Sequence, residues 1–209
     1  MKWADFLNQF ADKPLFNSSM LEIFPESRNY LQVQMSRWVK AGKLIQIRRS
    51  WYLIAEPYRF REIPPAVIAN NVVSPSYLSL DWALAFHGLI PEESPNPTSV
   101  TTARAENFQA VGRLFIYRHM QPLYFSGYSK MEVQGQDIVI ASPEKALWDK
   151  LYLHLRRHPF SFDWLEELRL QNLEEFNVDQ WEKYTSMNPS PSLHKASQRI
   201  TEFIRENRS

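Results

Sequence analysis

Between residues 28 and 49 lie many side chains of types that bond to phosphate groups or to the edges of nucleic-acid bases. Arginine and lysine neutralise phosphates, and asparagine, glutamine, serine and arginine can hydrogen-bond base edges. The segment from Ser27 to Ala55 holds six basic residues and no acidic residue. We interpret eight of its residues as candidate DNA-binding residues: Arg28, Asn29, Gln32, Ser36, Arg37, Lys40, Arg48 and Arg49.

Two elements must position these side chains. Leu31, Met35, Trp38 and Val39 recur at the spacing of one helical face, which predicts a helix over about 28–41, and Gly42 suits its C-terminal cap. Two apolar, β-prone runs follow at 44–47 and 51–54, around Arg48, Arg49 and Ser50, and they predict a hairpin with a basic tip.

Two further helices are expected ahead of this pair, over the first dozen residues and over 19–24. Three helices followed by a hairpin are the layout of a winged helix-turn-helix, a DNA-binding module. We therefore predict an α+β protein with such a domain at 1–56 and a mixed α/β C-terminal domain at 57–209. The latter ends in a helical tail from about residue 160.

The charge distribution agrees with this division. The whole chain has a net charge of only +1, yet residues 1–56 hold eight basic and five acidic residues, whereas the remainder holds sixteen and eighteen. Residues 160–184 alone hold seven acidic and two basic residues. Because opposite charges attract, we expect the basic N-terminal part to meet a polyanion. Because like charges repel, we expect the acidic tail segment to avoid DNA, and its charge would allow it to meet a basic protein.

Composition limits the class of protein. The 44% content of hydrophobic residues is ordinary for a folded chain, and the absence of cysteine excludes disulfides and thiolate metal sites. The N-terminal ten residues are too polar for a signal peptide, and no apolar run is long enough to span a membrane. We expect a cytoplasmic protein that does not bind membranes.

In the C-terminal part, helices are expected over 63–70, from Ser74-Pro75 to about Phe86, from Ser142 onward, and at 162–170, 178–185 and 192–207. Short β-prone runs at 98–102, 114–118, 123–128, 131–133 and 138–141 predict a small mixed or antiparallel sheet.

Three segments resemble a known family. The run AGKLIQIRRSWYLIAEP (41–57) resembles the wing of the N-terminal domain of the AbiEi family of type IV antitoxins. SPSYLSLDWALAFHGLIPE (74–92) and ASPEKALWDKLYL (141–153) resemble two segments of that family's C-terminal domain, in similar order and spacing. One departure is Ser50, where relatives often place glycine in the wing turn.

The resemblance implies a transcriptional repressor in a phage-defence locus. Members of the family bind inverted repeats in their own promoter, so the expected partner is double-stranded DNA. Their C-terminal domain counteracts a nucleotidyltransferase toxin encoded beside them, and a direct complex with the toxin is not assumed. From the residues alone, a protein-interaction module that docks a partner on the basic face stays open as the alternative.

Catalytic residues, cofactors and metal ions are not expected, and we do not predict an enzyme. His87 suits a helix end better than general-base chemistry, and His154 and His158 lie one helical turn apart without a third ligand. Asp137, Glu144 and Lys145 do not match a nuclease set, because the last two are adjacent. Lys145 and Asp149 are expected to form an exposed ion pair, with an additional nucleic-acid or toxin contact as the alternative.

Overall fold

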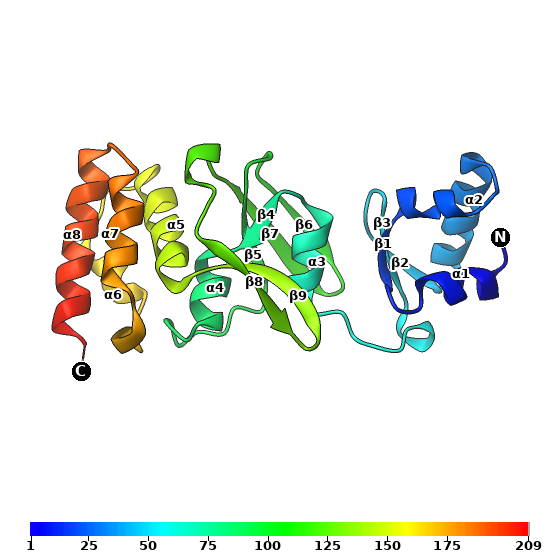
Figure 1. Ribbon diagram of the computed structural model, residues 1–209, viewed down its shortest axis with the longest axis horizontal. Helices are drawn as coiled ribbons and strands as arrows, with labels where there is room; N and C mark the ends of the chain where they lie inside the picture. The colour runs from blue at the N-terminus through cyan, green and yellow to red at the C-terminus, as the bar shows by residue number, and fades with distance from the viewer. Residues whose placement is uncertain (209) are drawn as a thin grey trace.

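The computed structural model describes residues 1–208, so the last residue of the predicted C-terminal domain lies outside the described part (Figure 1). Helices and two sheets make up the chain, which confirms the α+β class. Along the long axis of Figure 1, a small N-terminal sheet with its helices is followed by a larger sheet and then by the C-terminal helices. Within residues 1–208 no helix has the length and apolar character needed to cross a membrane.

The N-terminal part is a three-stranded antiparallel sheet with helices packed on one face. Its strands are ordered β1-β3-β2. Phe6, Phe10 and Phe16 form its core with Leu31, Met35 and Trp38 of the third helical element. The elements are α1 (Trp3–Phe10), β1 (Leu15–Asn17), the 3-10 helix η1 (Ser18–Ile23), α2 (Arg28–Lys40), β2 (Leu44–Arg48) and β3 (Trp51–Ile54).

Strand β1 was not predicted from the sequence. It has only three residues, too few to show an alternation, and it forms because Leu15, Phe16 and Asn17 pair with Leu53, Tyr52 and Trp51 of β3. The helix expected at 19–24 is the 3-10 helix η1, capped by the side chain of Asn17, which accepts a hydrogen bond from the amide of Ser19 at 3.0 Å.

Both faces of the N-terminal sheet are covered. Leu44 and Ile54 lie on the face that packs against α1 and α2. On the other face, Ile47 and Leu53 are buried in the larger apolar cluster of the C-terminal part, which includes α3. Leu15, Ile45 and Trp51 pack against the same cluster. The hydrophobic core therefore continues across the predicted boundary at residue 56.

The C-terminal part is built on a six-stranded mixed sheet of order β6-β7-β5-β4-β9-β8. β4 runs parallel to β9 and β5 parallel to β7, while the other neighbours are antiparallel. Figure 1 shows α3 on the side of the N-terminal part, and α4 and α5 beyond the sheet on the other side. The elements are η2 (Glu56–Tyr58), α3 (Pro65–Val72), β4 (Ser76–Leu78), α4 (Leu80–Phe86), β5 (Thr98–Thr101), β6 (Glu106–Ala110), β7 (Arg113–His119), η3 (Pro122–Tyr124), β8 (Tyr128–Val133), β9 (Gln136–Ala141) and α5 (Pro143–Leu155).

Two predictions for this sheet were wrong, and the edge strand β6 was not predicted. The helix expected from Ser74 begins only at Leu80, because residues 76–78 form the central strand β4 between β5 and β9. The run at 123–128 is mostly the turn η3 and irregular chain, and its first strand residue is Tyr128. β6 was missed since its sequence, ENFQA, carries little apolar character, as suits a strand at the edge of a sheet.

The predicted helical tail is present among the described residues. It comprises α6 (Phe162–Glu167), the 3-10 helix η4 (Leu173–Glu175), α7 (Val178–Ser186) and α8 (Pro191–Glu206). Figure 1 shows α7 and α8 next to α5, at the far end of the molecule from the N-terminal part. Trp181, Leu193, Ile200 and Ile204 are buried there in the same core as α5.

Candidate nucleic-acid interface

Helix α2 presents one face to the core and the other to solvent. Ser27 caps its start by accepting a hydrogen bond from the amide of Tyr30 at 3.4 Å. Leu31, Met35 and Trp38 point inward, and the Trp38 ring lies 4.8 Å from that of Trp3. The packing of these apolar side chains fixes the rotation of the helix, so the polar residues between them must face outward.

All six candidate residues on α2 are exposed, as the sequence predicted for this face: Arg28, Asn29, Gln32, Ser36, Arg37 and Lys40. Three of them, Arg28, Gln32 and Ser36, line a hollow of about 410 Å³ that also reaches Arg49 in the hairpin turn. Residues from the helix and from the turn are thus brought to one concave surface. The other three lie on α2 outside this hollow.

The hollow also contains two acidic groups that precede the acid-free segment 27–55. Glu22 and Glu26 contribute to its lining. The Glu26 carboxylate accepts a hydrogen bond from the N-terminal amine, and that bond lowers its pKa. Its negative charge is therefore matched by a positive one, and the basic side chains of the hollow are not paired with it.

Ser36 is less free than its exposure suggests. Its hydroxyl donates a hydrogen bond of 3.0 Å to the carbonyl oxygen of Gln32, one turn earlier in α2. The oxygen can still accept a bond, but the proton is used within the helix. Asn29 and Gln32 are better placed to donate to a base edge, because their side chains make no hydrogen bond within residues 1–208.

The two arginines of the hairpin have different environments. Arg49 is exposed at the turn. Arg48 instead forms a two-pronged pair with Glu106 of β6, with Nη1 to Oε1 at 2.8 Å and Nη2 to Oε2 at 2.7 Å. Its guanidinium also lies 5.7 Å from the centre of the Phe108 ring. The structure therefore places Arg48 between the two parts of the chain, apart from the hollow.

Nothing in the sequence pattern predicts this contact. Glu106 is 58 residues from Arg48 and lies in the strand that the apolar pattern missed. The hairpin turn is formed by Arg49 and Ser50, and the φ of 68° at Ser50 lies in the left-handed region that glycine adopts more readily. Serine occupies this position at a cost, because the turn requires that conformation.

The expectation for Lys145 and Asp149 was wrong. Their side chains are 1% and 0% exposed and form a buried ion pair within α5. Asp149 Oδ2 also accepts bonds from the hydroxyls of Tyr77 at 2.9 Å and Ser79 at 2.7 Å. Burial raises the pKa of Asp149 and lowers that of Lys145, and each charge opposes the shift of the other. Neither side chain can reach a nucleic acid or a protein partner.

The two family-like segments of the C-terminal part meet at this pair. Tyr77 and Ser79 belong to 74–92, whereas Lys145 and Asp149 belong to 141–153. A second link joins His87 Nε2 to the carbonyl oxygen of Ala141 at 2.8 Å. Both segments stand out in the sequence by their resemblance to the family, but the sequence does not predict that they share a buried polar contact.

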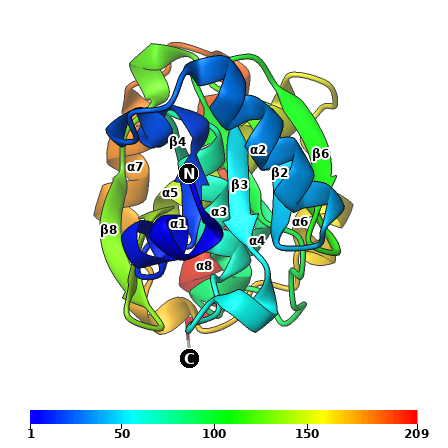
Figure 2. The same ribbon diagram turned by 90° about the vertical axis from the view of Figure 1, so that its right-hand side faces the viewer.

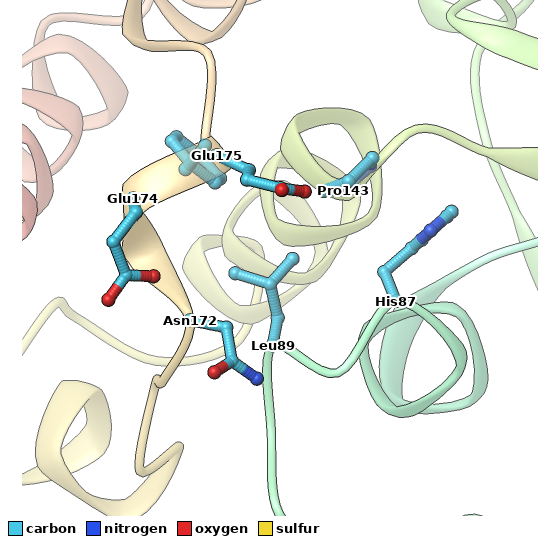
Figure 3. A pocket seen from close by; sticks show the side chains of 7 residues that line it. His87, Leu89, Pro143, Asn172, Glu174 and Glu175 are labelled. Atoms are coloured by element: carbon cyan, nitrogen blue, oxygen red, sulfur yellow. The ribbon is translucent and has the colours of Figure 1, made fainter.

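A second hollow, of about 470 Å³, lies beside His87 (Figure 3). Figure 3 shows His87 across this hollow from Glu174 and Glu175 of η4. Because His87 Nε2 is occupied by the Ala141 carbonyl, the ring is held at the end of α4, where the sequence placed it. The lining includes no serine, threonine or lysine that could act with it as a nucleophile.

The remaining candidate side chains do not form a reactive cluster. His154 and His158 have ring centres 5.4 Å apart, and His154 stacks on Trp164 at 4.5 Å. Asp137 pairs with Lys130, and Glu144 accepts a bond from the amide of Asn177 at 2.9 Å. Among residues 1–208, no group of three histidine or carboxylate side chains is arranged to hold a metal ion.

No protein-family model matches the chain, and no curated protein matches it significantly.

Proposed function

We propose that the chain binds double-stranded DNA through α2 and the hairpin turn, as a winged helix-turn-helix, and acts as a transcriptional repressor. The observation that carries this proposal is the exposed basic and polar face of α2, which continues through a hollow to Arg49. An exposed helix of this kind fits the major groove, and a basic hairpin turn beside it can follow the backbone.

The exposed side chains divide into two roles. Arg28, Arg37, Lys40 and Arg49 carry the positive charges and would supply affinity through phosphates. Asn29 and Gln32 have free amide groups, which suit adenine edges. Arg48 was expected to contact DNA, but this proposal gives it no such contact. Its guanidinium is held against β6 by Glu106 and Phe108 and links the two parts of the chain.

The antitoxin role of the C-terminal part rests on the sequence resemblance. In this proposal the chain represses its own promoter at inverted repeats in a phage-defence operon, and its C-terminal part counteracts a nucleotidyltransferase toxin. The contact between residues 74–92 and 141–153 supports treating the two family-like segments as one unit. A direct complex with the toxin is not part of the proposal.

One observation favours a second function, a protein-docking module. On the exposed part of α2, Tyr30 is 46% and Val33 51% exposed. Apolar side chains on such a face are typical of contacts between proteins. In this alternative the same surface would bind an acidic partner, and a promoter would not be recognised.

A gel-shift experiment separates the two functions. The full chain is titrated into a duplex from the region upstream of its own gene, with a scrambled duplex as competitor. Arg37→Ala and Arg49→Ala should each weaken binding, and the slope of log affinity against log salt should fall by about one for each lost phosphate contact.

Lys130→Ala is the matched control. This variant also removes one positive charge, but from β8, at the opposite edge of the large sheet from β6. Figure 2 likewise shows β8 on the other side of the molecule from β6. If the chain binds DNA through α2 and the hairpin turn, the control variant should bind the promoter duplex as tightly as the parent chain. No shift at low salt, or equal losses in all three variants, would contradict the proposed interface.

A further inference from the structure

A second basic surface lies at the C-terminal end of α5, and the proposed repressor function does not use it. Two adjoining hollows of about 440 and 560 Å³ share Arg156 and Arg157 in their linings. Six basic side chains from four parts of the chain line them: Arg118, Lys150, Arg156, Arg157, Lys195 and Arg199. We call these six residues, with Phe160, Phe162 and Trp164, the basic-aromatic band.

The aromatic residues of the band lie at the start of the acidic segment 160–184, but its acidic side chains, such as Asp163 beside Phe162, do not line the two hollows. The linings of the two hollows contain one acidic side chain, Asp81, which is paired with Lys150. Within residues 1–208, no ion pair involves Arg156, Arg157, Lys195 or Arg199. These four charges are therefore available to an external anion.

Helix capping explains only part of the band. Arg156 and Arg157 follow the last turn of α5, where the helix dipole favours positive charge. Lys195 and Arg199, however, lie one turn apart in α8, and Arg118 belongs to β7. The dipole of α5 does not account for these three residues, of which Arg118 lines one hollow and Lys195 and Arg199 line the other, each beside Arg156 and Arg157.

Aromatic rings lie among the charges. Phe162 is 49% exposed, and the guanidinium of Arg199 is 5.7 Å from the centre of its ring. Phe160 packs against it with ring centres 5.7 Å apart. A ligand that consists of phosphate alone has no apolar or aromatic surface that could stack on an exposed phenyl ring. Unpaired bases stack on such rings while arginines contact the backbone, and in a duplex the base faces are already covered.

We propose that the basic-aromatic band binds single-stranded nucleic acid. The charges of Arg156, Arg157, Lys195 and Arg199 would contact phosphates, and Phe162 would stack against a base. This site is separate from the duplex surface of α2, so the chain would hold two nucleic-acid sites of different type.

Fluorescence anisotropy with the full chain tests the proposal. The probes are labelled 12-nucleotide oligomers of dT and of rU, with a 12-base-pair duplex as the comparison. Phe162→Ala should weaken binding of the single strands about tenfold, as expected for the loss of one stacked base. Arg157→Ala combined with Arg199→Ala should also lower the salt slope by about 0.7 for each phosphate contact.

Matched variants show whether the effect belongs to the band. Lys130→Ala removes one exposed charge from β8, outside both proposed nucleic-acid sites, and should leave single-strand binding unchanged. Circular dichroism checks that Phe162→Ala folds, and Phe162→Trp, which keeps a stacking surface, should bind at least as well as the parent chain.

Three results would overturn the proposal. The first is that neither oligomer binds at about 50 mM salt, a concentration at which contacts to phosphates are strong. The second is equal weakening of duplex and single strand by the band variants, which would make the band part of a general DNA surface. The third is retained single-strand binding in both Phe162→Ala and the double arginine variant. Because Arg37→Ala tests α2 separately, failure here leaves the repressor proposal standing.

Discussion

The buried pair of Lys145 and Asp149 provides the sharpest test of the structure. Replacing Lys145 with methionine keeps the volume of the side chain but leaves the Asp149 carboxylate without its cation. Both side chains are almost completely buried, so solvent cannot compensate. Breaking a buried pair by removing one partner costs about 3–5 kcal/mol. For a chain of this size, about 2–4 °C of melting temperature is lost per kcal/mol, so we expect a fall of about 6–20 °C.

Asp149→Asn should cost a similar amount, because it leaves the Lys145 ammonium unpaired. The double variant, Lys145→Met with Asp149→Asn, contains no buried charge. The new amide oxygen can still accept the bonds from Tyr77 and Ser79 that now reach the carboxylate. We therefore expect the double variant to be less destabilised than either single variant, with a loss of about 1–2 kcal/mol.

Urea denaturation followed by tryptophan fluorescence measures these differences. Trp148 is one of seven tryptophans that contribute to this signal, and its ring centre lies 4.9 Å from the Lys145 ammonium. Lys150→Met on the same helix is the control, because its pair with Asp81 is partly exposed and should be worth less than about 1 kcal/mol. Losses that simply add in the double variant, or a single-variant loss as small as the control, would refute the burial of the pair.

Three further predictions concern the turns and the contact between the two parts. Ser50→Gly should raise the free energy of unfolding by about 0.5–1 kcal/mol in a thermal melt, because the left-handed φ of 68° suits glycine. Gly127→Ala should lower the free energy of unfolding by about 3 kcal/mol in the same melt, since a Cβ there would lie 2.5 Å from the hydroxyl of Tyr184. An unchanged melt would show that this contact relaxes freely. Glu106→Gln should cost about 1 kcal/mol in urea, and a cycle with Arg48→Met should show coupling between the two residues, whereas additive losses would mean that their pair contributes nothing.

The sequence predicted well where one element carries its own periodic pattern. Helix α2 shows four apolar residues on one face, and both its bounds and its exposed side chains agree with the prediction within a residue. The start of helix α5 was predicted at Ser142, whose side-chain oxygen accepts a hydrogen bond of 3.2 Å from the amide of Lys145. In both cases the deciding information lies within a few neighbouring residues.

The sequence predicted poorly where distant segments decide the outcome. Strands β1, β4 and β6 are three to five residues long and owe their existence to partners elsewhere in the sheets. Lys145 and Asp149 appear as an ordinary surface pair along a helix, and only the packing of α5 against β4, α4 and α7 buries them. Similarly, Arg48 and Arg49 are adjacent in sequence, but the partner strand β6 separates their roles.

If the chain binds DNA as proposed, the N-terminal sheet, packed on both faces, would also set the geometry of the complex. Because Ile47 and Leu53 are anchored in the core of the C-terminal part, α2 cannot swing independently of the larger body. A chain seated on one half of an inverted repeat would hold that body at a fixed angle to the duplex axis. The distance at which a second copy fits would then be set by the outline of the body, so operators with altered spacing should be rejected sharply instead of being tolerated through a flexible tether.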